Sequence, residues 1–419
     1  MEDITQPLKE IIDKGFPDPR INRLIVPGDY RYVEPWGTEL HPSNSEQTQI
    51  DRDMADDTIN IGYYFDGPFL PIRNGASYTL YDLMRALHTQ ENIYPTLMNC
   101  FREWDVPEDY YGQDFRSVFI APEDYYHDTG VVRKSLDNFD IQIAQFYNPE
   151  VLLRLGSLLM QKGVKIMLDV QNIDHVLLQR LGASQTETDK AMHLQIDAIA
   201  MTDHTFCRSV IDKQYIVDLG IDPDKVSVYR GGIFAGDFKF RHRTQDTKKL
   251  LCLGHMYYQP NEEALDQIVE NIMPGLDHSY TLTVIGSTPP YVQKKYESNK
   301  IHFRGGVDNL SNELLDFDIA VAPIYAGSGT RLKILDYLAS GIPVITTDLG
   351  IEGLDPSIRD GLTIENDIHK YPEIIKNISS RPASYQLRAQ VGRRIIENVF
   401  DWSHCVQPFI KTYKETLDL

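Results

Sequence analysis

The sequence predicts an α/β protein made of two doubly wound domains that face a cleft. At 419 residues the chain is too long for one ordinary hydrophobic core. From Thr58 onward, short β-branched runs alternate with helical patterns, which is typical of parallel sheets covered on both faces. A polar stretch over 236–247 divides these runs into two similar series, so we expect two domains joined by a linker.

The first series follows an acidic, weakly periodic segment, 1–57, which we expect to be an N-terminal extension or cap. A strand, a glycine loop and a helix over 58–90 then open an N-terminal domain, 58–240. Helical patterns are "VLLRLGSLLMQKG" and "DHVLLQRLGA", and "MTDHTFC" (201–207) is interpreted as a helix start. Further strands are expected at 117–121, 141–146, 164–170, 196–201 and 225–230.

The second series predicts a C-terminal domain, 241–400, followed by a final helix within 401–419. Its expected strands are "LLCLG", "YTLTVIG", "KIHFRG", "DIAVAP", "IPVITT" and "GLTIE". Its helices are expected at about 262–273, 309–316, 330–340, 367–378 and 385–398. Doubly wound sheets bind ligands at the carboxyl ends of their strands. In this series, those ends carry Gly254, Gly286, Gly305 and Pro323.

Composition narrows the class of protein. The net charge of −20 disfavours nucleic acid as a partner, and the basic stretch 239–249 is better interpreted as a solvated linker than as a phosphate track. No apolar run could cross a bilayer, and the N-terminus lacks a signal pattern, so we expect a cytoplasmic protein without a transmembrane segment. Four scattered Cys lack metal-ligand spacing. The sequence leaves both homo- and hetero-oligomers open.

The most informative stretch is "PIYAGSGTRLKILDYLASGIPVITTDLG", which begins at Pro323. A glycine loop before a helix that starts at Thr330 would present backbone N–H groups to an anion, above all a phosphate. Arg331 and Lys333 would add charge, although cations at a helix N-terminus cost a few tenths of a kcal/mol unless an anion is bound. Asp336 is the lone charge in the apolar helix. It could pair with Lys333, face solvent or bind a ligand hydroxyl.

This stretch resembles the donor-binding signature of retaining glycosyltransferases with the GT-B fold, of the family 4 type (glycosyl transferases group 1). "GSGTRLKILD" is nearly identical to the "GSGTRLKILE" of one branch. "LLCLGHMYYQPNEEAL", "LTVIGS", "IHFRGGVDNLSNEL" and "FDWSHCVQPFIKTY" resemble other segments of that branch, so the likeness spans 249–419. It is weaker over 58–235, where "PIRNGASYTLYDL" resembles the glycine-rich loop of the family. The resemblance implies two Rossmann-like domains and a C-terminal helix that crosses back to the first domain.

The resemblance also implies a function: transfer of a sugar from a nucleotide diphosphate sugar to an acceptor, with retention of the anomeric configuration and without a metal or other cofactor. The acceptor could be a glycan, a lipid-linked saccharide, a protein or a small molecule. Asp336 would hold the ribose, and backbone groups of 305–307 would lie beside the base. The implied catalytic residues are His175, Arg331 and Lys333, and the implied donor-binding residues are Gly75, Gly254, His255, Gly306, Val307, Ser328, Gly329, Thr330 and Asp336.

The chain departs from the family pattern at three places, one of which is Asp336, where Asp replaces the closing Glu of the Glu-x7-Glu motif and shortens the reach to the ribose by one methylene. Ser328 stands where the first Glu of the Glu-x7-Glu motif is expected. His255 and Pro260 replace the usual Arg and Lys after the first strand of the donor domain, so the diphosphate would depend on Arg331 and Lys333. These departures leave the donor open. They also leave two alternative functions: a non-catalytic partner subunit of a glycosyltransferase complex, and another GT-B enzyme such as a nucleotide-sugar epimerase.

Two residues of the first domain allow both a functional and a structural interpretation. His175, in "DVQNIDHVLLQR", could bond a sugar hydroxyl, or it could merely follow a helix-capping Asp174. Gly75, in "NGAS", could let a ligand approach the backbone closely, or it could close a turn.

Overall fold

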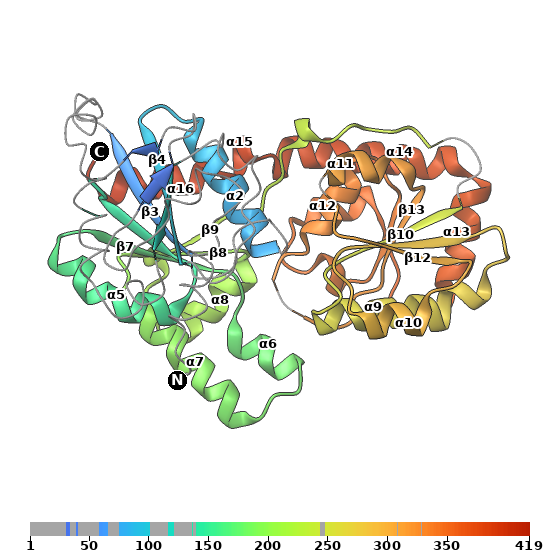
Figure 1. The fold of residues 1–419 in the computed structure, drawn as a ribbon, viewed down its shortest axis with the longest axis horizontal. Helices are drawn as coiled ribbons and strands as arrows, with labels where there is room; N and C mark the ends of the chain where they lie inside the picture. The colour runs from blue at the N-terminus through green and yellow to red at the C-terminus, as the bar shows by residue number, and fades with distance from the viewer. Residues whose placement is uncertain are drawn as a thin grey trace, which may run out of the picture.

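The computed structural model describes residues 31–33, 39–40, 58–65, 75–100, 116–120, 136, 140–243, 248–307, 309–327 and 329–419. Most of the expected extension 1–57, the glycine loop before Gly75 and the candidate residue Ser328 therefore lie outside the described residues. The described residues form two lobes, each built around its own sheet (Figure 1).

The first lobe contains a nine-stranded sheet. Seven strands run parallel, in the spatial order β5, β4, β3, β6, β7, β8 and β9. At one edge of the sheet, β1 pairs antiparallel with both β2 and β5. Both β1 and β2 come from the segment expected to be an extension or cap. The strands, in spatial order, are β2 (Glu39–Leu40), β1 (Arg31–Val33), β5 (Arg116–Ile120), β4 (Ile93–Cys100), β3 (Ile59–Phe65), β6 (Ile143–Phe146), β7 (Lys165–Val170), β8 (His204–Cys207) and β9 (Val226–Val228).

Helices cover both faces of this sheet because its central strands are apolar on both sides. In β3, Ile61 and Tyr63 pack toward α2, whereas Tyr64 packs toward α5 and α7. Local signals fix the helix ends: Asn148 caps α5, and Ser184 forms a capping box with Glu187 at the start of α7. The helices are α2 (Gly75–His88), α5 (Pro149–Gln161), α6 (Asp174–Arg180), α7 (Gln185–Ala200) and α8 (Val210–Asp218).

Three expectations for this lobe are wrong. The run 196–201 is not a strand but the end of α7, because the capping box at Ser184 starts a helix that continues through it. The strand follows at β8, so 201–207 is not a helix start. Strand β4 was not predicted. It contains Pro95, which is tolerated because β4 begins to pair with β5 only at Thr96.

The second lobe contains six parallel strands in the order β12-β11-β10-β13-β14-β15. Strands β11 and β12 are added on one side of β10 and strands β13 to β15 on the other, so the strand order reverses between β10 and β13. The strands are β10 (Lys249–Leu253), β11 (Thr281–Ile285), β12 (Ile301–Gly305), β13 (Ile319–Ala322), β14 (Val344–Thr346) and β15 (Thr363–Ile364). The helices are α9 (Gln259–Gln267), α10 (Pro290–Tyr296), α11 (Leu310–Glu313), α12 (Leu332–Ala339), α13 (Tyr371–Ser380) and α14 (Pro382–Ile395). Two π turns, Ile268–Ile272 and Ile396–Phe400, extend α9 and α14. Short 3-10 turns are Pro223–Lys225, Ala235–Asp237, Met273–Gly275, Leu314–Asp316, Leu349–Ile351, Pro356–Gly361 and Ile368–Lys370.

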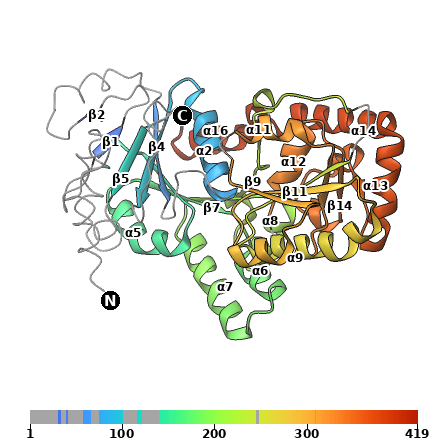
Figure 2. The same cartoon turned by 45° about the vertical axis from the view of Figure 1, so that its right-hand side comes forward.

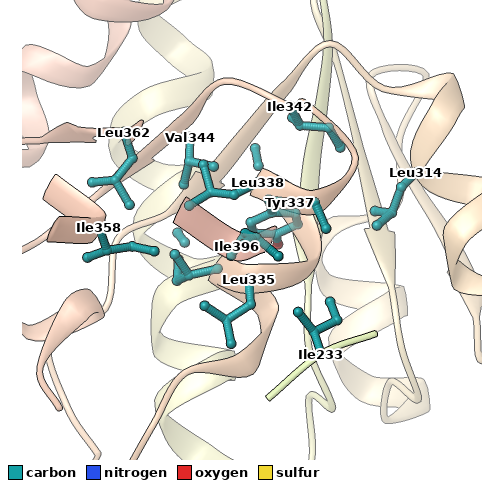
Figure 3. Close-up of a cluster of buried hydrophobic side chains, with 14 of the residues drawn as sticks. Ile233, Leu314, Leu335, Tyr337, Leu338, Ile342, Val344, Ile358, Leu362 and Ile396 are labelled. Atoms are coloured by element: carbon teal, nitrogen blue, oxygen red, sulfur yellow. The ribbon is translucent and has the colours of Figure 1, made fainter. Parts of the chain in front are cut away.

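Helix α12 lies in the core of the second lobe. Leu335, Tyr337 and Leu338 are fully buried and pack with Val344 of β14 and with Ile396 (Figure 3). The helix begins at Leu332 with Arg331 as its N-cap, two residues later than the expected start at Thr330. Packing on all sides holds α12 in place, so its N-terminus is a rigid part of the molecule.

The C-terminal residues cross back to the first lobe, as predicted. The short α15 (Trp402–Cys405) and α16 (Gln407–Thr416) return to the first lobe (Figure 1), and α16 lies beside the first sheet in both views (Figures 1 and 2). Trp402 and Phe409 belong to the hydrophobic cluster of that lobe. The Tyr413 hydroxyl lies 2.6 Å from that of Tyr63 and donates to Gln145 Oε1 at 2.6 Å. The predicted fold class, two doubly wound α/β domains with a crossing C-terminal helix, is therefore confirmed.

Ion pairs also join the two lobes. Arg180 of α6 contacts Glu352 at 2.7 Å, and Arg230 contacts Asp355 at 2.8 Å. In the part of the chain that the structure describes, no helix is long and apolar enough to cross a membrane.

Candidate functional site

A cavity of about 1070 Å³ lies between the lobes, at the carboxyl ends of strands from both sheets. Small-molecule sites in doubly wound proteins occupy this position, and the volume is sufficient for a nucleotide-sized ligand. The first lobe contributes Tyr78, Thr79, Gln171, Asn172 and Arg208, and the second lobe contributes Gly254, His255, Gly306, Val307, Gly327, Gly329, Thr330, Arg331, Lys333 and Asp336, among others.

The glycine loop after β13 closes against the first lobe. Gly329 has φ +76°, and a Cβ at this position would lie 2.5 Å from Asn172 Oδ1. A side chain here would be both strained and in collision with the opposite lobe. Glycine is therefore required for the two lobes to meet at this edge of the cavity.

The N-terminus of α12 opens into the cavity and carries unsatisfied donors. Among the described residues, no side chain caps it, and the buried Thr330 Oγ1 has no hydrogen-bond partner. Arg331, 8% exposed, donates through Nη1 to the Gly329 carbonyl and lies 3.7 Å from Glu352. Its buried Nη2 has no hydrogen-bond partner within the described part of the chain, and burial lowers the pKa of the guanidinium. These groups fit an anion, because each could donate to one.

Lys333, in the first turn of α12, also lines the cavity. Its Nζ donates to Asn261 Oδ1 at 2.7 Å, and Asn261 Nδ2 donates to the His255 carbonyl at 3.0 Å. A Cβ at Gly254 would lie 2.9 Å from Asn261 Cγ and 3.1 Å from Lys333 Nζ, so only glycine leaves room for this contact. Burial lowers the pKa of Lys333. A neutral amide thus positions the ammonium group without neutralising its charge.

Asp336 lies one turn after Lys333 and is 6% exposed, so it does not face solvent. In the described part of the chain, no ion pair within 4.0 Å joins it to Lys333, and its buried Oδ1 has no hydrogen-bond partner. Burial raises the pKa of Asp336 to about 7, an effect that Lys333 opposes. Of the three interpretations of Asp336, an acceptor for a ligand hydroxyl is the one that agrees with this geometry.

The remaining candidates from the second lobe also reach the cavity. His255, Gly306 and Val307 line it. The His255 ring stacks on Tyr257 with 5.2 Å between centroids, and its buried Nδ1 has no hydrogen-bond partner among the residues that the structure describes. Burial lowers the pKa of His255, so the ring is held towards its neutral form.

The first-lobe candidates are placed differently. Gly75 is the first residue of α2, whose next turn lines the cavity through Tyr78 and Thr79. His175 is not among the residues that line the cavity. Its ring packs edge-on against Tyr215 of α8, 6.3 Å between centroids, and burial lowers its pKa. The structure thus does not bring His175 together with Arg331 and Lys333.

Several cavity residues from the first lobe were not predicted from the sequence, among them Gln171, Asn172 and Arg208. Gln171 and Asn172 follow β7, and Arg208 follows β8. The available signal was their position directly after a strand. For Arg208 this signal was lost, because β8 was interpreted as a helix start.

Unpartnered polar atoms gather around this cavity. In the described residues, His255 Nδ1, Thr330 Oγ1, Arg331 Nη2 and Asp336 Oδ1 are buried without a hydrogen-bond partner. Each such atom costs about 1–3 kcal/mol, so a cluster of them is typical of a site shaped for a polar ligand. Over the same residues, no group of three or more His, Cys, Asp or Glu side chains is arranged to hold a metal ion.

Comparison with known proteins agrees with this arrangement. Residues 247–380 match the family described as glycosyl transferases group 1. No curated protein sequence matches the chain.

Solved structures extend the likeness over both lobes. A sucrose-phosphate synthase from Thermosynechococcus elongatus matches with a TM-score of 0.69 and 13% identity, over 86% of this chain and 99% of the other. A glycosyltransferase from Rickettsia africae ESF-5 matches with a TM-score of 0.67 and 12% identity, over 86% of this chain and 99% of the other. HepE from Anabaena, solved with UDP and glucose, matches with a TM-score of 0.63 and 12% identity, over 84% of this chain and 99% of the other. Identities this low show the fold alone. The chain therefore combines the GT-B fold with a glycosyl transferases group 1 domain over residues 247–380.

Proposed function

We propose that the protein is a retaining glycosyltransferase of the family 4 type, which moves a sugar from a nucleoside diphosphate sugar to a carbohydrate-type acceptor. One observation carries this proposal: unpartnered buried polar atoms of Thr330, Arg331 and Asp336 converge on one cavity at the N-terminus of α12. Donors for an anion and an acceptor for a hydroxyl lie about one helical turn apart, which is what a phosphate-linked ribose requires.

In this proposal the diphosphate lies across the N-terminus of α12. Backbone N–H groups, Thr330 Oγ1, Arg331 and Lys333 would donate to its oxygens, and Asp336 would accept from the ribose. Backbone groups near Gly306 and Val307 would lie beside the base.

The same groups would promote the reaction. Breaking the glycosidic bond places negative charge on the departing diphosphate, and donors fixed in a partly dry site stabilise that charge more strongly than water does. Arg331 is buried and donates to the Gly329 carbonyl, and the half-buried Lys333 donates to Asn261, so little reorganisation is needed. We propose that these two cations take the role that a metal ion has in other nucleotide-sugar enzymes.

Uridine donors are the first to test. HepE was solved with UDP and glucose. The protein would be incubated with UDP-sugars, then with GDP- and ADP-sugars, in the presence of a chelator and a panel of acceptor sugars. Proton NMR would follow both the loss of donor and the anomeric configuration of the product.

We expect donor-dependent product with the anomeric configuration of the donor. An inverted product would contradict the retaining mechanism. Binding of donor without turnover for any acceptor or water would instead favour a non-catalytic subunit. The double variant Arg331→Gln/Lys333→Gln is the matched negative control.

A further inference from the structure

Arg208 is the one arginine that the first lobe places in the cavity, among the residues that the structure describes. It follows β8 and is 4% exposed. One guanidinium nitrogen, Nη2, donates to Gln171 Oε1, and the guanidinium carbon lies 4.7 Å from the centre of the Tyr229 ring. An amide and an aromatic face hold the side chain in place, and neither carries a compensating charge.

The positive charge of Arg208 has no direct carboxylate partner. Within the described part of the chain, no carboxylate oxygen lies within 4.0 Å of its guanidinium nitrogens. Two carboxylates, Asp169 and Asp212, act on Arg208 through space without contacting it, and Asp169 accepts from the Tyr229 hydroxyl at 2.6 Å. A buried arginine is normally paired, because removing an isolated charge from water is costly. Arg208 is therefore a cation that an anionic ligand would complete.

Arg208 also lies near the anion-binding end of α12. A Cβ built on Gly231 would be 3.1 Å from Arg208 Nη1, 3.0 Å from Leu332 Cδ2 and 3.7 Å from Thr330 Cγ2. All three atoms therefore lie within 3.7 Å of the position that this Cβ would take. The guanidinium approaches the helix N-terminus from the opposite lobe, on the same cavity that Arg331 lines.

We propose that Arg208 binds the sugar-bearing phosphate of the donor, which becomes the terminal phosphate of the departing nucleoside diphosphate; this inference rests on the proposed function. Cations from both lobes then converge on one phosphate. The expected cations after β10 are replaced by His255 and Pro260, and Arg208 supplies from the first lobe the charge that is missing from the second. Leaving-group stabilisation is complete only when the lobes are closed.

Calorimetric titration with uridine, UMP and UDP tests the proposal, with the guanosine and adenosine series run in the same way. The variants are Arg208→Met, Arg208→Lys and, as a matched control, Arg230→Gln. Arg230 also bridges the lobes, to Asp355, but is not among the residues that line the cavity. We expect Arg208→Met to raise the Kd for UDP by about tenfold or more and the Kd for UMP by less than about twofold. The lysine variant should be intermediate, and Arg230→Gln should bind like the wild type.

Thermal unfolding of the unliganded variants separates binding from folding. Arg208→Met removes a charge that attracts the buried Asp169, so we expect it to unfold at a lower temperature than the wild type, and affinities are compared only at temperatures where both proteins are folded. If Arg208→Met does not fold, the lysine variant decides. Unchanged UDP affinity in a folded variant would overturn the proposal, and a raised KM for an anionic acceptor in that variant would assign Arg208 to the acceptor instead. Equal loss of UMP and UDP would also overturn it. Failure of the wild-type protein to bind any of these nucleotides would contradict the proposed function itself.

Discussion

Replacing Asp336 by Asn should make the unliganded protein more stable while weakening its affinity for nucleotide. Burial raises the pKa of Asp336 from 3.8 to about 7. The folded protein therefore keeps a proton that the unfolded chain releases as the pH rises between these values. Stability due to this group falls across that window, and the full penalty applies above about pH 7.

The magnitude follows from the same two pKa values. Each pH unit between them corresponds to about 1.4 kcal/mol, so ionised Asp336 costs at most about 4 kcal/mol of stability above pH 7. The variant also loses the attraction of the carboxylate to Lys333, which reduces the gain. We expect Asp336→Asn to be more stable by about 1–3 kcal/mol at pH 8 and by almost nothing near pH 4.

The assay is denaturant unfolding of both proteins at pH 8 and pH 4, compared by their midpoints at equal m-values. Asp318→Asn is a matched control. That buried carboxylate accepts the backbone N–H groups of Lys248 and Lys249 at 3.1 and 3.0 Å, so its loss should destabilise by about 1–3 kcal/mol. A destabilised Asp336→Asn at pH 8, or a gain of equal size at pH 4, would refute the reasoning. Loss of the ribose contact should raise the nucleotide Kd by about 10- to 100-fold.

Three further changes test other parts of the site. Asn261→Asp should weaken nucleoside diphosphate binding by about tenfold in calorimetry, because a carboxylate would neutralise Lys333, whereas an unaltered Kd would show that the amide has no such role. Gly329→Ala should lower kcat/KM by at least about tenfold, because its Cβ would meet Asn172 Oδ1 at 2.5 Å; wild-type kinetics would mean that the lobes do not close as described. His175→Ala should leave kcat/KM within about twofold of the wild type, since the ring does not line the cavity, and a large loss would restore the catalytic assignment made from sequence.

The second lobe could be predicted from sequence in some detail because its signals are local. Most of its strands are short apolar runs, β10 to β13 end near a glycine or proline, and the proposed phosphate-binding groups follow one another from Gly329 to Lys333. The first lobe was harder. The run 196–201 fits a strand and a buried helix equally well by periodicity, and only the capping box at Ser184 and Glu187, eleven residues or so upstream, decides between them.

The convergence of the site is a tertiary property. Gln171, Asn172 and Arg208 come from two strands that are separated in sequence, and they meet the glycine loop only when both lobes are in place. No spacing along the chain encodes that meeting. Likewise, the contact of Asn261 with Lys333 spans 72 residues and depends on the absence of a side chain at Gly254.

Thermal unfolding of the purified protein against nucleoside diphosphates and their sugars, without added metal, tests the central claim most directly. A ligand that binds only the folded protein stabilises it by about 2.7 kcal/mol at one hundred times its Kd, which is a shift of several degrees. We predict that one base raises the midpoint, that its sugar conjugate raises it further, and that Lys333→Ala abolishes both shifts. No shift with any nucleotide, or an equal shift in Lys333→Ala, would contradict the assignment of this cavity to a nucleotide sugar.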